Sequence, residues 1–205
     1  KLGIKWFAVS NASEAVDLRE MGIKGEILIL ASTPVNGISL LKEYNLITTV
    51  PSLEYAKTLS ENGGGRVHIK LDTGMSRIGL DIKNATEQIK EIKKLENISV
   101  EGIFTHLCVA DSADEDDIAF SKNQISAFKK VVAECKECGI EFEYKHFLNS
   151  AGGIYHYDSD SDLVRLGITQ YGLLPNAELS CPFEIEPAMD FKAVVTQVKY
   201  IDKGD

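Results

Sequence analysis

Short apolar runs alternate with longer amphipathic segments along most of the chain. The runs are rich in Val, Ile, Leu and Phe, which is typical of strands buried on both faces of a parallel sheet. The segments between them have helical periodicity; Asn11 can cap the first of them, and Gly22 and Gly139 stand where two of them end. The predicted strands are 6–10, 26–30, 46–50, 67–71, 100–107, 142–149 and 163–168.

Each strand and the helix after it form a βα unit, and right-handed crossovers wind such units into a doubly wound sheet or a closed barrel. A doubly wound sheet is expected to carry a GxGxxG motif after its first strand. That spacing does not occur, and the glycines at 63–65 precede a strand and indicate a turn. We therefore predict an α/β fold: a (β/α)8 TIM-type barrel over residues 1–178 that lacks its first unit in this chain.

The pattern changes after Pro175. Residues 193–200 alternate in the manner of a strand, no helical segment follows them, and a polar Lys-Gly-Asp turn comes next. We predict that residues 183–205 are the beginning of a β-rich C-terminal domain, with the boundary near Pro175 and Pro182.

Composition narrows the class of ligand. The formal net charge of -9 disfavours a nucleic-acid surface, which needs clustered Lys and Arg. No apolar stretch approaches the roughly 20 residues that span a bilayer, and the first three residues do not resemble the start of a signal peptide. We expect a small-molecule ligand, a cytoplasmic location and no membrane contact by this chain.

Cysteines and acidic residues offer two weaker signals for metals or redox chemistry. The four cysteines lack the spacing of a disulfide framework, which fits a reducing cytoplasm. Cys135 and Cys138 form a CxxC within a helical run, but no second pair lies nearby to complete a zinc site, and residues 111–117 have the composition of a solvated acidic loop. We predict no metal site.

Charged and polar side chains gather where predicted strands end. Residues 70–80, KLDTGMSRIGL, follow an apolar run, and His106, Asn149 and Arg165 lie at or near the ends of three other strands. In a barrel these strand ends share one mouth, where the chemistry of TIM-barrel enzymes takes place. The Ser-Ala-Gly-Gly run from Ser150 suits an anion such as phosphate at a helix start, although a capping serine is the alternative.

The remaining histidines have simpler interpretations. His68 and His146 alternate within predicted strands, which favours satisfied residues of the barrel interior. His156 lies between Tyr155 and Tyr157, which favours packing at a helix end.

These motifs resemble those of the alanine racemase family of pyridoxal-phosphate enzymes. The resemblance covers essentially the whole chain. It rests on KLDTGMSRIGL with Lys70, Asp72 and Arg77, on THLCVAD with His106, Ala110 and Asp111, on Asn149-Ser150-Ala151, and on RLGITQYGLLP with Arg165, Gly167, Ile168, Tyr171, Gly172 and Pro175.

The resemblance implies a role for each matched residue around the cofactor, pyridoxal 5'-phosphate. Arg165 faces the ring nitrogen and donates to it without protonating it, which weakens the cofactor as an electron sink and suppresses transamination. His106 packs beside the ring and helps to hold Arg165. Ser150, within the Asn149 motif, binds the phosphate together with the backbone of Gly167 and Ile168.

On the substrate side, the resemblance places Arg77 near the substrate carboxylate and near a base from the partner subunit. In many members the lysine that corresponds to Lys70 is carbamylated. The carbamate is an anion, and the resemblance implies that it orients Arg77. The resemblance also implies a homodimer whose two subunits share each active site.

The implied activity is interconversion of the L- and D-forms of a small amino acid by two-base proton exchange at Cα, for bacterial cell-wall precursors. The lysine base occurs in a KAxAYGHG context on the first barrel strand. The tyrosine base follows a turn similar to that at residues 203–205. We expect both bases to lie outside this chain, which then corresponds to the middle of a longer enzyme.

The substrate prediction rests on two segments. FTHLCVADSADEDD and YGLLPN are similar to the serine/alanine racemase domains of vancomycin-resistance type, which follow a membrane domain. This similarity implies serine or alanine as substrate and a tether to the inner face of the cell membrane through a region outside this chain.

Two alternatives use the same kind of barrel. Non-catalytic pyridoxal-phosphate homeostasis proteins end with the barrel, so the segment from Phe183 and the presence of Arg77 argue against them. An unrelated sugar-phosphate barrel that uses Ser150 and the acidic loop leaves Arg165 and the second domain unexplained.

Overall fold

The computed structural model describes residues 3–204. Strands and helices alternate, as predicted, up to residue 171. In chain order the elements are β1 (Trp6–Val9), α1 (Ala12–Glu20), β2 (Glu26–Ile29), η1 (Val35–Gly37), α2 (Ile38–Glu43), β3 (Ile47–Val50), α3 (Leu53–Glu61), β4 (Gly65–Asp72), β5 (Leu80–Asp81), α4 (Ala85–Lys94), β6 (Ile98–Phe104), α5 (Glu115–Glu137), β7 (Tyr144–His146), β8 (Leu148–Asn149), α6 (Ser150–Tyr155), β9 (Val164–Arg165) and η2 (Ile168–Tyr171).

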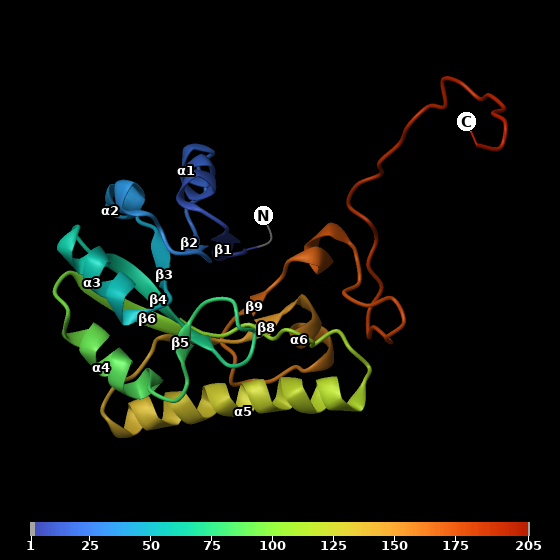
Figure 1. Ribbon diagram of the computed structural model, residues 1–205. Helices are drawn as coiled ribbons and strands as arrows, with labels where there is room; N and C mark the ends of the chain where they lie inside the picture. The colour runs from blue at the N-terminus through green and yellow to red at the C-terminus, as the bar shows by residue number, and fades with distance from the viewer. Residues whose placement is uncertain (1–2, 205) are drawn as a thin grey trace.

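The main sheet is parallel, and its strands neighbour one another in chain order: β1, β2, β3, β4, β6 and β7. A doubly wound sheet reverses its strand order, whereas a barrel does not. Helices α1 to α5 follow one another around the outer side of this sheet (Figure 1). The strand order therefore confirms the barrel-type α/β fold.

Aromatic rings inside the sheet show how strongly it curls. Trp6 of β1 and Tyr144 of β7 belong to opposite ends of the strand order, yet their ring centroids are 4.6 Å apart. The ring of His68, from β4, lies 5.6 Å from Trp6 and 5.9 Å from Tyr144. The first and last strands thus face each other across a shared interior.

Local signals account for the helix ends. The Asn11 side chain accepts from the backbone N–H of Glu14 and caps α1, as predicted. Gly22 (φ +85°) and Gly139 (φ +76°) follow α1 and α5 in the left-handed conformation that ends helices. The apolar side of α4 buries Ala85, Ile89 and Ile92 in the core.

The structure corrects three strand predictions. Strand β5 was not predicted; it pairs with the last two residues of β4 after a glycine-containing loop. The run 142–149 is interrupted at Phe147, which separates β7 from β8. The run 163–168 contains only β9, which pairs with β8 in a separate two-stranded sheet.

The C-terminal segment carries no sheet among the described residues. Residues 172–204 contain no helix or strand, and the chain leads away from the barrel (Figure 1). The strand expected at 193–200 has not formed, because a strand needs a neighbour for its backbone groups. Val194 and Val198 are 88% and 83% exposed. The division into two domains stays a prediction.

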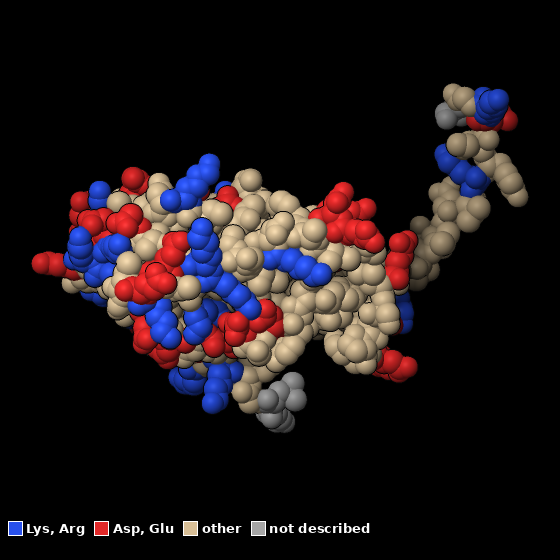
Figure 2. Space-filling view, turned by 90° about the horizontal axis from the view of Figure 1, so that it is seen from below, with Lys and Arg blue, Asp and Glu red and all other residues tan. Residues whose placement is uncertain are grey.

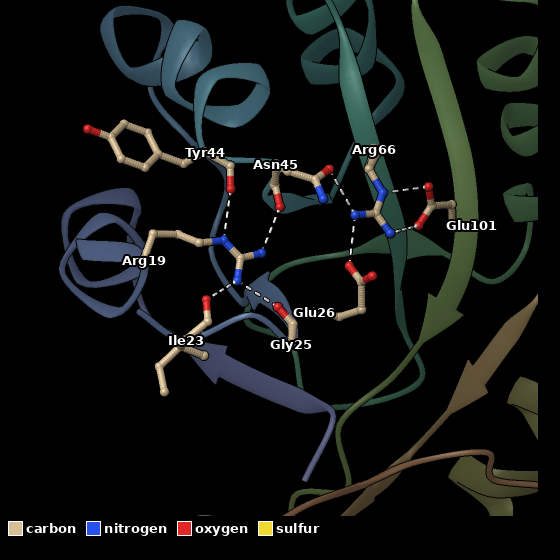
Figure 3. Close-up of polar contacts among 8 residues, drawn as sticks. All are labelled: Arg19, Ile23, Gly25, Glu26, Tyr44, Asn45, Arg66 and Glu101. Atoms are coloured by element: carbon tan, nitrogen blue, oxygen red, sulfur yellow. Dashed lines mark hydrogen bonds and ion pairs between the residues drawn. The ribbon is translucent and has the colours of Figure 1, made fainter. Parts of the chain in front are cut away.

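Two arginines connect elements near the amino ends of the strands (Figure 3). Arg66 of β4 donates from Nε and NH2 to both carboxylate oxygens of Glu101, at 2.8 and 2.9 Å, and pairs with Glu26 at 2.7 Å. Arg19 of α1 donates to four backbone carbonyls, those of Ile23, Gly25, Tyr44 and Asn45. These contacts tie α1, β2 and the end of α2 together.

Replacing Arg19 by Lys should destabilise the fold. A lysine ammonium cannot reach four carbonyls that a planar guanidinium satisfies together, so partly buried acceptors lose their donors at a cost of about 1–3 kcal/mol. Urea unfolding of the full-length protein measures the change. Lys94→Ala, which removes only an exposed ion pair with Glu91, serves as the control. Equal stability of R19K and the wild type would contradict this role for Arg19.

Candidate active site

One cavity of about 820 Å³ opens at the carboxyl ends of the strands. It collects every residue that the sequence predicted for the site, from β4, the loop after it, the segments after β6 and β8, and β9 with the loop that follows. These residues are Lys70, Arg77, His106, Asn149, Ser150, Arg165, Gly167 and Ile168.

Arg165 is held at the cavity wall by neutral acceptors. Its NH1 lies 2.6 Å from Nδ1 of His146, and its NH2 donates to the carbonyl of Thr105 at 2.7 Å and that of Phe147 at 3.4 Å. A guanidinium has five N–H donors, so two remain after these contacts. Burial lowers the pKa of Arg165 to about 10, which still leaves it protonated at neutral pH.

The histidine that contacts Arg165 is His146, and not His106. The predicted contact between His106 and Arg165 is not among the hydrogen bonds of the described residues, whereas His146 makes one. His106 lines the cavity, and burial, with Arg165 next in size, lowers its pKa to about 4. A histidine two residues from Tyr144 on the same face of β7 was the available signal for an inward position.

Ser150 does not cap the helix that it begins. Asn149 is the cap of α6: its Oδ1 accepts from the N–H of Gly152 at 2.8 Å, and its Nδ2 donates to the carbonyl of Leu107 at 3.0 Å. The Oγ of Ser150 instead accepts from the N–H of Gly167 at 2.9 Å. Ser150 therefore joins the start of α6 to the loop after β9, where Ile168 follows.

Lys70 is buried beside the aromatic ring of Phe104. It is 2% exposed, its Nζ donates to the carbonyl of Leu71 at 2.7 Å, and Nζ lies 5.6 Å from the ring centre of Phe104. Burial lowers its pKa to about 8, and the cations Arg165 and Arg77 act in the same direction, against Asp72. A larger fraction of neutral amine follows at neutral pH.

Arg77 reaches the cavity from a constrained loop. Oδ1 of Asp72 accepts from the N–H groups of Gly74 and Ser76, both at 3.0 Å. Ser76 has φ +55°, a conformation that residues other than Gly, Asn and Asp rarely adopt. Within residues 3–204 the Arg77 guanidinium has no hydrogen bond or ion pair, so all its donors are available to a ligand.

The charge of the cavity suits an anionic ligand. Lys70, Arg77 and Arg165 line it, and two of them keep unused N–H donors. Across the described part of the chain no cluster of three or more His, Cys, Asp or Glu has a geometry that could hold a metal ion. None of the helices in residues 3–204 combines the length and apolarity that a membrane crossing needs.

Comparisons with known proteins agree on one family. The family model described as alanine racemase, N-terminal domain, matches residues 1–175. An alanine racemase of Treponema denticola is 35% identical and matches 99% of this chain and 55% of its own length. An amino-acid racemase of Enterococcus faecalis is 34% identical and matches 100% of this chain and 29% of its own length.

A solved structure matches equally well. Alanine racemase of Corynebacterium glutamicum superposes with a TM-score of 0.82 at 33% identity, over 98% of this chain and 57% of that chain. The chain therefore spans about half the length of the alanine racemases that it matches.

Neutral histidines make stability depend on pH. Burial lowers the pKa of His68 to about 3 and of His106 to about 4, and holds that of His146 well below its usual value. In the unfolded chain a histidine takes up its proton near pH 6.5, so below this pH the unfolded state binds more protons. The contribution of these histidines to the free energy of unfolding is therefore fully present above about pH 6.5 and decreases towards about pH 5. Most carboxylates are still ionised over this range, so they contribute little to the change.

Urea unfolding at several pH values tests this expectation. The free energy of unfolding should decrease as the pH is lowered over that window. The slope of this free energy against pH measures how many more protons the unfolded state binds, and His106→Asn should reduce that number by up to one. A stability that stays constant between about pH 7 and pH 5 would mean that these histidines are not neutral in the folded protein.

Proposed function

The chain belongs to the alanine racemase family, and we propose that it forms most of the cofactor-binding barrel of a pyridoxal-phosphate-dependent enzyme that interconverts the L- and D-forms of a small amino acid. The observation that carries the proposal is the cavity at the strand ends, where the cations Lys70, Arg77 and Arg165 meet neutral His106 and the Ser150–Gly167 pair.

The residues present fit pyridoxal 5'-phosphate. Ser150, whose hydroxyl is placed by the N–H of Gly167, and the backbone N–H of Ile168 would hold the phosphate. An unused N–H group of Arg165 would donate to the ring nitrogen, and His106 would pack beside the ring. Asn149 supports this site indirectly, because its side chain caps α6. When bound, the cofactor supplies an electron-withdrawing ring that acidifies the Cα–H bond of an amino acid.

Arg165 tunes that chemistry through its own protonation. Its pKa of about 10 keeps it a donor at neutral pH, and it does not release its proton to a ring nitrogen, which is a far weaker base. Arg165 would therefore hydrogen-bond the ring nitrogen without protonating it, which would keep the electron withdrawal moderate. This favours return of a proton to Cα over transamination.

Arg77 binds the substrate carboxylate in this proposal. Its free donors at the cavity mouth match a carboxylate in a bidentate pair. The two bases that exchange the Cα proton, a lysine and a tyrosine, come from outside these residues, the tyrosine from the partner subunit of a homodimer. The similarity to the alanine racemase of Treponema denticola supports alanine as substrate, and serine stays a prediction from the sequence.

The biological setting follows from this substrate. D-Amino acids of this size enter bacterial cell-wall precursors, so we infer a cytoplasmic enzyme that supplies them. A membrane tether through a preceding region stays a prediction.

Exchange of the Cα proton tests the activity directly. In deuterium oxide the full-length protein with the cofactor should incorporate deuterium at Cα of L-alanine or L-serine and produce the D-form. Arg165→Glu should slow racemisation at least tenfold, increase transamination and move the absorption of the bound cofactor to longer wavelength. Lys94→Glu, an exposed charge reversal on α4, is the control. Tight cofactor binding without any exchange would refute the racemase and favour a homeostasis protein.

Lys70 is a candidate for carbamylation, which converts the neutral amine and carbon dioxide into a carbamate anion and a proton. Its lowered pKa supplies the amine, and the anion would pair with Arg77, which has no other partner among the described residues. Protein incubated with carbon-13-labelled bicarbonate should show a carbamate signal by NMR that Lys70→Ala lacks.

The activity of the same variants completes the test. Lys70→Ala should lose most of the activity and recover part of it with added acetate, whereas Lys83→Ala, on the exposed loop after β5, should behave as the wild type. A K70A enzyme of full activity would exclude the proposed role of the carbamate.

A further inference from the structure

His68 lies behind the cavity wall and does not line the cavity. Its side chain is completely buried and packs beside the rings of Trp6 and Tyr144. It packs flat against Gly102: a Cβ added at that position would stand 2.7 Å from three atoms of the imidazole ring. A glycine at 102 is therefore what leaves room for the ring.

A chain of hydrogen bonds runs from His68 to the cavity. Nδ1 of His68 lies 2.9 Å from Nε2 of His146, and Nδ1 of His146 lies 2.6 Å from NH1 of Arg165. Arginine only donates, so Nδ1 of His146 must accept. A neutral His146 then carries its proton on Nε2, and Nδ1 of His68 must accept that proton's hydrogen bond.

Nε2 of His68, at the end of this series of hydrogen bonds, agrees with the assignment. A neutral His68 that accepts at Nδ1 carries its own proton on Nε2, and this buried nitrogen has no hydrogen-bond partner among the described residues. The opposite polarity would turn an N–H of His146 towards an N–H of Arg165 at 2.6 Å. Two facing donors at that distance repel each other. The arrangement therefore leaves Nε2 of His68 without a partner and lets Nδ1 of His146 accept from Arg165.

We propose that His68 is a positioning residue: by accepting from His146, it keeps the Nδ1 lone pair of His146 directed at Arg165, and thereby holds the unused donors of Arg165 in the cavity. The catalytic consequence rests on the proposed racemase function. The tautomer of His146 does not, because it follows from contacts within this chain.

Two variants of nearly equal shape isolate the accepting atom. In His68→Asn the side-chain Oδ1 can take the place of Nδ1 and still accept, whereas His68→Leu fills similar space with a methyl group that cannot. Both variants remove the unpaired Nε2. The comparison uses the full-length protein with bound pyridoxal phosphate, after circular dichroism has shown that both variants fold.

The first readout is the nitrogen-15 NMR spectrum of labelled histidine, which distinguishes protonated from unprotonated ring nitrogens. In the wild type and H68N, His146 should carry its proton on Nε2 alone; in H68L it should show a mixture of tautomers. A wild-type His146 protonated on Nδ1 would overturn the proposal even if neither variant folds.

The second readout is the partition between racemisation and transamination. His68→Leu should reduce kcat for racemisation roughly 3- to 10-fold, the effect of one buried hydrogen bond, with little change in KM and a larger share of transamination. His68→Asn should stay within about twofold of the wild type. Equal losses in both variants would mean that His68 acts by packing and would overturn the proposal. Absence of racemisation in the wild type would count against the proposed function, and the NMR readout would still decide the role of His68.

Discussion

The cation of Arg165 is the interaction on which the rest of the site depends. No carboxylate pairs with it among the described residues; its hydrogen-bond partners are a histidine nitrogen and two backbone carbonyls, and its guanidinium carbon lies 5.3 Å from the ring centre of Phe104. A partly buried cation without an anionic partner acts on the titratable groups around it. That field helps to lower the pKa of Lys70, His68, His106 and His146, although burial is the larger cause for each. The position of Arg165 therefore adds to the effect of burial on each of these neighbours.

The opposite ends of the strands handle charge in the other way. There Arg66 is paired with Glu26 and Glu101 and also donates to Asn45, so four of its five N–H groups have partners (Figure 3). Seen from below, Lys and Arg also mix with Asp and Glu over much of the surface on the barrel side (Figure 2). Paired charges stabilise the fold and leave little for a ligand, whereas unpaired donors at the carboxyl ends are available for one. Stability and ligand binding thus occupy opposite ends of the same strands.

The sequence predicted the elements that local chemistry decides. The strands with continuous apolar runs and the cap at Asn11 are confirmed, and the candidate site residues lie together at the strand ends, because these features depend on periodicity and on strand direction alone. The roles of those residues stay a prediction. Contacts between distant segments were missed. The break at Phe147 and the contact of His146 with Arg165 depend on how β7, β8 and β9 meet, and the Ser150–Gly167 bond depends on the pairing of β8 with β9. The pattern of residues along the sequence does not predict such contacts between distant segments.

The loop after β4 shows why the site is formed before any ligand arrives. The left-handed conformation of Ser76 costs on the order of 1 kcal/mol, and a strained residue persists only where its surroundings hold it. Asp72 supplies two hydrogen bonds to the loop, and Gly79 (φ +132°) lets it return against β4. Backbone contacts, not a side-chain partner, therefore fix the position of Arg77. Its donors are available to an incoming anion, and the backbone that carries them needs little further ordering when the anion binds.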